Sequence, residues 1–180
     1  HMKTKYLIII LIITLAISGI VIFIIDFNHD SKKTTQTMQI IKKTSVKLDS
    51  NITEYNINRD DLAKKTSTYY KDNFVNDYKN ILEILNNQEQ TIKNTTKNVK
   101  ILDKNCQNNI FNDSSINNIC NTYKLTYEQI INVYVNDIEN FNNLVDTYNN
   151  ETKLNLKKFT SSNVDKYIDY NKDGKYEDKK

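Results

Sequence analysis

The two cysteines, Cys106 and Cys120, are the residues whose chemistry and spacing are easiest to interpret. They flank a short polar segment between two stretches of helical periodicity. Outside the cytoplasm, where the N-terminal sequence discussed below would place them, an isolated pair normally forms a disulfide. Two free thiols are the alternative. The chain has no CxxC motif, and no histidine or second cysteine pair lies nearby, so we expect a structural bridge rather than a redox or zinc site.

The C-terminal tail contains a second candidate site. Its DYNKDG sequence at 169–174 resembles the first half of an EF-hand or dockerin-type calcium loop, in which Gly174 would supply the sharp turn. The twelfth position is Lys180, where these families place a bidentate glutamate. The resemblance implies weak calcium binding, and a simple polar turn is the alternative. The ligands would be Asp169, Asn171, Asp173 and Glu177.

Catalytic and nucleic-acid-binding patterns are weak. His29 is the only histidine besides His1, which precedes Met2 as a cloning remnant would. The carboxylates are spread over polar helix faces, so we expect no enzyme, although paired-carboxylate chemistry stays open. The basic residues form no long stripe, so we expect no nucleic-acid partner. A modest cluster comprises Lys32, Lys33, Lys42, Lys43 and Lys47.

The composition indicates which elements carry these residues. The chain has 180 residues with no proline and two glycines, Gly19 and Gly174. Tight turns depend on glycine and proline, so a long stretch without either favours a few long helices. Seven-residue steps of apolar side chains support this interpretation. They are Tyr78, Leu85, Ile92 and Val99, and then Tyr127, Tyr134, Phe141 and Tyr148.

These patterns predict an all-α fold, in which an N-terminal transmembrane helix precedes an elongated antiparallel three-helix bundle of coiled-coil type. The tyrosines should lie in the core with their hydroxyl groups at its rim. Between Gln88 and Asn98 only Ile92 is apolar, so packing there should be loose or polar. A capping box is expected at Thr126 and Gln129. The predicted elements are a helix at about 34–55, a break at 56–60, a helix at 61–104, a loop at 105–112, a short helix at 113–119 and a helix from 126 to about 160.

The N-terminus carries the strongest signal in the sequence. Residues 6–25 contain no charge, and 20 helical residues reach about 30 Å, the thickness of a bilayer core. A cleaved signal peptide is the alternative, with residues 16–18 as a small-residue cleavage site. Basic residues flank both ends equally, but the short N-terminal end favours an N-inside, C-outside orientation.

The predicted organisation therefore has four parts: a cloning remnant and short cytoplasmic end at 1–5, an anchor or uncleaved signal at 6–25, an extracytoplasmic bundle at 26–160, and a polar tail at 161–180. This layout, with the Tyr148–Asn150 neighbourhood, resembles LemA-type bacterial envelope proteins, and we transfer no residue role from them. We expect a cell-membrane protein that acts as an interaction or structural module with a protein partner at the envelope. The alternatives are a ligand-binding or sensory ectodomain that works with a partner membrane protein, and an envelope hydrolase.

Overall fold

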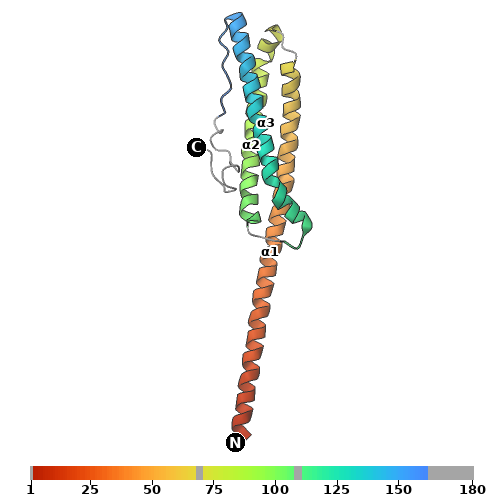
Figure 1. Cartoon of the computed structure of the whole chain (residues 1–180), viewed down its shortest axis with the longest axis vertical. Helices are drawn as coiled ribbons and strands as arrows, with labels where there is room; N and C mark the ends of the chain where they lie inside the picture. Colours follow the sequence, from red (N-terminus) through yellow and green to blue (C-terminus); the bar gives the residue numbers. More distant parts are fainter. Residues whose placement is uncertain (1, 68–70, 108–110, 162–180) are drawn as a thin grey trace. The chain divides into compact units, whose positions relative to one another are not determined.

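The computed structural model describes the backbone of residues 2–67, 71–107 and 111–161, and the side chains of 31–66, 73–107 and 111–161. In these parts the chain is all-helical, with three helices in a bundle-like arrangement and no strand. The helices are α1 (Met2–Ser67), α2 (Lys71–Cys106) and α3 (Ser114–Thr152) (Figure 1). The chain divides into two compact units, residues 1–40 and 41–180. The second unit contains every contact described below.

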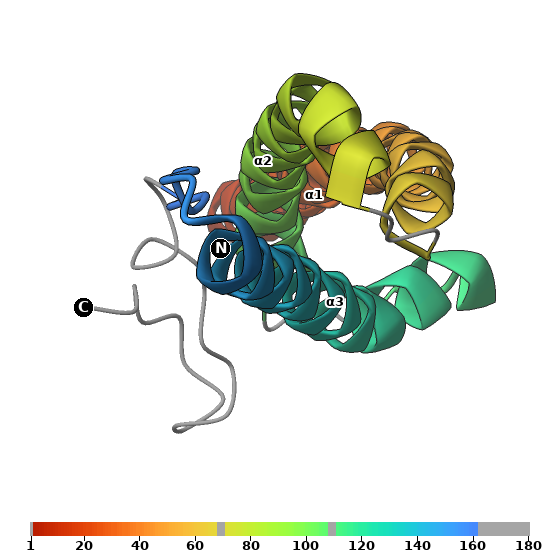
Figure 2. The same cartoon turned by 90° about the horizontal axis from the view of Figure 1, so that it is seen from above.

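Within the second unit, successive helices run in opposite directions. Lys65 near the end of α1 pairs with Asp77 near the start of α2. Late in α2, Asp103 accepts a hydrogen bond from Tyr123, an early residue of α3. In Figure 2 the gold part of α1, the green α2 and the teal-to-blue α3 lie around one centre. The order of the contacts therefore gives an up-down-up bundle.

The apolar stripes explain why these helices pack together. The α3 step of Tyr127, Tyr134, Phe141 and Tyr148 is buried throughout, and on α2 Leu85, Ile92 and Val99 are fully enclosed. Aromatic rings fill one end of the core, where Phe74 contacts Phe141 and Tyr148 at centroid distances of 6.2 and 5.5 Å. Large buried rings contribute much of the hydrophobic stabilisation in such a core. The seven-residue steps read from the sequence are thus core positions, except for Tyr78, which is half-buried.

Two predicted helix boundaries were wrong. The break expected at 56–60 does not occur, since α1 continues to Ser67. The stripe of Leu48, Tyr55 and Leu62 stays buried through this segment, and packing of this kind overrides the weak helix propensity of Asn and Asp. The predicted short helix at 113–119 is the first part of α3. Thr126 caps nothing, because its hydroxyl donates to the Thr122 carbonyl within the helix.

The end of α3 also differs from the prediction. The helix stops at Thr152 rather than near 160, and Lys153 takes a left-handed conformation with φ 58°. Its N–H donates to the Asn149 carbonyl at 2.9 Å, a common way to end a helix. Residues 153–161 then follow a non-helical path, and Phe159 is buried there.

The predicted span at 6–25 lies outside the residues whose side chains are described. Over 31–66, 73–107 and 111–161, no helix combines the length and hydropathy that a membrane crossing needs.

Candidate functional site

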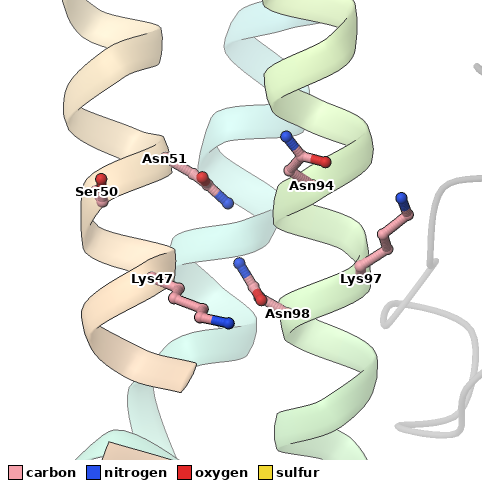
Figure 3. Close-up of a pocket in the computed structure, with 6 residues that line it drawn as sticks. All are labelled: Lys47, Ser50, Asn51, Asn94, Lys97 and Asn98. Atoms are coloured by element: carbon pink, nitrogen blue, oxygen red, sulfur yellow. The ribbon is translucent and has the colours of Figure 1, made fainter. Parts of the chain in front are cut away.

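A polar groove opens between α1 and α2. It has a volume of about 280 Å³ and faces solvent. Figure 3 shows its six lining residues, three from each helix. We refer to this site as the Lys/Asn groove. It is lined by Lys47, Ser50, Asn51, Asn94, Lys97 and Asn98.

Helical spacing brings these side chains together. Lys47 and Asn51 are one turn apart on α1, and Asn94 and Asn98 are one turn apart on α2, so each pair shares a helix face. Their neighbours along the two helices, Leu48, Thr95 and Val99, are buried. The three asparagines are half-buried, whereas the lysines and Ser50 are exposed. The groove therefore has an amide floor and a cationic rim.

The hydrogen bonding of the floor is incomplete. The Nδ2 atom of Asn51 is shut off from solvent and has no hydrogen-bond partner. Figure 3 shows this amide pointing from α1 toward α2, with Lys47 extending in the same direction. Gln90 donates to Asn94 Oδ1 at 3.5 Å. None of the lining residues is acidic. Donors and positive charge therefore dominate the site.

A second hollow, of about 180 Å³, lies beside a buried carboxylate on α3. Asp137 accepts hydrogen bonds from the Tyr55 hydroxyl at 2.9 Å and from Arg59 Nε at 3.2 Å. Burial, reinforced by the neighbouring Asp137 charge, raises the pKa of Tyr55 far above its ordinary value. Tyr55 therefore stays protonated and acts as a donor. This cluster joins α1 to α3. It provides hydrogen-bond donors for the Asp137 carboxylate, which is only 7% exposed.

The middle of α2 is polar, as the thinning of its apolar stripe predicted. Gln88, Thr91 and Thr95 are all buried. The two threonine hydroxyls donate to carbonyls one turn back in the helix. Both polar atoms of the Gln88 side chain are buried without a hydrogen-bond partner. Unpaired buried amides are uncommon and destabilising, so this layer of the core is less favourable than its neighbours.

The connection between α2 and α3 is held by a disulfide, a helix cap and an ion pair. Cys106 and Cys120 form a disulfide with a Cα–Cα distance of 5.4 Å. Asp113 caps α3 by accepting from the Ser115 and Ile116 backbone N–H groups at 2.9 and 3.4 Å. The Ser115 hydroxyl bond, followed by that from Lys42, lowers the pKa of Asp113 to about 2. The Lys42 ammonium lies 3.1 Å from this carboxylate and links α1 to the same connection.

Residues 153–161 form a strap held by amide side chains. Asn149 makes two hydrogen bonds to the backbone of Leu156, at 2.8 and 2.9 Å. Seven residues earlier, Asn142 makes the same pair of bonds to Phe159, at 2.8 and 3.0 Å. The Tyr78 hydroxyl donates to the Lys157 carbonyl at 2.7 Å. The segment is therefore fixed through its backbone by side chains of α2 and α3.

The predicted calcium ligands Asp169, Asn171, Asp173 and Glu177 lie outside the described residues. Where side chains are described, no group of three or more His, Cys, Asp or Glu could hold a metal ion. Lys47 belongs to the basic cluster noted in the sequence, but the asparagines of the groove were not singled out. The chain is so rich in asparagine that only the packing of α1 against α2 distinguishes them.

Over the residues that the structure describes, fold and sites together define an all-helical, bundle-like protein with three helices and an internal disulfide. Comparison of the chain with family models, with curated proteins and with solved structures found no match.

Proposed function

We propose that this protein is a membrane-anchored, non-enzymatic module of a bacterial cell envelope, which holds its helical bundle outside the cytoplasm to bind or space a protein partner. The uncharged run at 6–25 supports the anchor, since it matches the thickness of a bilayer core. In this proposal the first helix crosses the membrane once, and the antiparallel coiled-coil-like bundle extends into the extracytoplasmic space.

The observation that carries the proposal is the Cys106–Cys120 bridge. Disulfides persist in oxidising compartments and are rare in the cytosol, where thiols are kept reduced. A bridge between α2 and α3 therefore fits a bundle that has left the cytoplasm. The same bridge fixes the α2–α3 connection, and a stable surface suits a module that binds a partner.

Two experiments test this function. Alkaline extraction of membranes from cells that express the full chain should leave the protein in the membrane pellet, whereas release into the supernatant would remove the anchor. Crosslinking in the native membrane, followed by mass spectrometry, should recover one reproducible envelope protein. That crosslink should disappear when the contacting lysine is replaced by glutamine. A distribution of crosslinks that follows protein abundance would contradict a specific partner.

A second function, that of a ligand-binding ectodomain, is favoured by the Lys/Asn groove. Its unpartnered Asn51 donor and its two lysines suit a polar ligand. In this case a partner membrane protein would carry the signal across the membrane.

A further inference from the structure

We propose that the Lys/Asn groove binds an oxyanion, namely the phosphate or carboxylate of a small hydroxyl-rich ligand such as a sugar phosphate or a uronic acid unit. The inference rests on the second function above, ligand binding, and it names the ligand class. It does not depend on the membrane anchor.

The charge of the groove selects an anion. Lys47 extends its ammonium group between the two helices, Lys97 adds a second one at the rim, and no carboxylate is among the lining residues. Elsewhere in the bundle, cationic side chains do find such partners, as Lys42 does with Asp113 and Lys158 with Asp146. A positive charge in a groove that lacks carboxylates favours the binding of an anion. An oxyanion supplies the negative charge.

The hydrogen-bond donors of the groove point to the same ligand. Asn51 Nδ2 is enclosed and lacks an acceptor. Phosphate and carboxylate oxygens accept several hydrogen bonds each, and charge-assisted bonds are the stronger kind. A bound oxyanion would therefore accept a hydrogen bond from Asn51 Nδ2, which the protein itself leaves unpaired.

The size and lining of the groove indicate how large and how polar the ligand is beyond its anionic group. A volume of about 280 Å³ is at the lower end of small-molecule sites, so the ligand is small. No aromatic or aliphatic side chain lines the groove, so an apolar or stacking ligand gains nothing there. Ser50 and the amide of Asn98 suit hydroxyl groups beside the anion. In Figure 3 Lys47 extends toward Asn98, whereas Lys97 lies on the outer side of α2, at the rim.

Calorimetric titration of the full chain in neutral detergent tests the proposal. The probes are glucose 6-phosphate, glucuronate and neutral glucose. We expect saturable binding of the two anions, at least tenfold tighter than glucose and weaker as salt is added. A polygalacturonate arm distinguishes the source: tighter binding per sugar unit than the monomer indicates a polymer segment, and equal binding indicates a free small ligand.

Matched variants locate the site. The double variant Lys47→Gln/Lys97→Gln should weaken binding at least tenfold. The control Lys43→Gln/Lys79→Gln removes one exposed lysine from each of the same helices outside the groove, and it should change affinity less than twofold. Asn51→Leu removes the enclosed donor without changing the charge and should also weaken binding, with circular dichroism confirming that the helices remain.

Three results would overturn the proposal: no saturable heat with either anion, equal losses in the groove and control variants, or glucose binding as tightly as the anions. The last result would leave the ligand-binding function in place and remove only the oxyanion class. None of the three bears on the membrane anchor, which the extraction experiment tests separately.

Discussion

Replacing Asp137 with alanine removes the carboxylate that joins α1 to α3 inside the bundle. The change leaves the Tyr55 hydroxyl buried without an acceptor and frees Arg59, which is half-exposed and can turn to solvent. Losing a hydrogen bond to a charged group destabilises by about 1.5–3 kcal/mol, and the stranded hydroxyl adds to that loss. Because Arg59 is half-exposed, loss of its ion pair with Asp137 adds less than about 1 kcal/mol to the destabilisation.

The expected total is a loss of about 3 kcal/mol in the free energy of unfolding. For a chain of this size, it corresponds to a fall in Tm of about 6–12 °C. Circular dichroism of the full chain in neutral detergent, with heat and with urea, measures both quantities. Asp137→Asn keeps an acceptor for Tyr55 and should lose less. A double-mutant cycle with Tyr55→Phe should show a coupling of about 0.5–3 kcal/mol.

Asp146 provides the matched control for this variant. It is also an ion-paired aspartate of α3, but it and its partner Lys158 are about half-exposed. Exposed pairs are usually worth less than about 1 kcal/mol, so Asp146→Ala should lower the Tm by at most a few degrees. If Asp137→Ala and Asp146→Ala have the same effect, the buried cluster does not stabilise the bundle and our reasoning about it is wrong.

Three further predictions follow from the structure. The bridge between Cys106 and Cys120 closes a loop with a sequence separation of 14. Reduction of the bridge, or replacement of both cysteines by serine, should therefore lower the free energy of unfolding by about 3 kcal/mol. An unchanged urea midpoint would contradict this prediction. The pKa of Asp113 is lowered from 3.8 to about 2 in the fold. The stability that the Asp113 carboxylate contributes is therefore complete above pH 3.8 and is lost as pH falls through about 2. Asp113→Asn should lack this acid-dependent loss, and identical acid-unfolding curves for the variant and the wild type would refute the prediction. Burial raises the pKa of Tyr55 and Tyr123 well above 10.0, so their stabilisation is complete below pH 10.0 and declines as pH rises toward the raised values. Ultraviolet difference titration should show these two tyrosines ionising only with alkaline unfolding, whereas ordinary titration in the folded state would contradict it.

Much of the bundle could be predicted from the spacing of apolar residues. The seven-residue steps gave the buried faces of α2 and α3, because side chains seven residues apart return to one helix face. The gap in the α2 stripe correctly indicated a polar core around Gln88 and Thr95. Periodicity is a local property, and it survives in a sequence of unusual composition.

The ends of the helices were harder to predict. Local signals such as Asn, Asp and Thr suggested a break at 56–60 and a cap at Thr126, but packing of the stripe carries both helices through these points. The end of α3 depends on the amides of Asn142 and Asn149 binding backbone atoms up to 17 residues away. No local pattern reports such distant partners.

The tyrosine hydroxyl groups were also predicted only in part. They were expected at the rim of the core, but those of Tyr55 and Tyr123 reach the buried acidic residues Asp137 and Asp103. The hydroxyl of Tyr127 lies 2.9 Å from Thr96 on α2. Sequence periodicity places a ring on a face, but the position of its hydroxyl depends on the neighbouring helix. The Lys/Asn groove was missed for the same reason, because two helices contribute to it.

Topological labelling tests the proposed function most directly. Val46 is 69% exposed on α1 and lies beyond the predicted span, so Val46→Cys provides a single reactive thiol while Cys106 and Cys120 are paired. In spheroplasts of a bacterial host that express the full chain, we predict that a membrane-impermeant maleimide labels this variant without lysis and leaves the wild type unlabelled. Labelling of Val46→Cys only after the membrane is broken, with the native cysteines also reactive, would contradict a bundle held outside the cytoplasm.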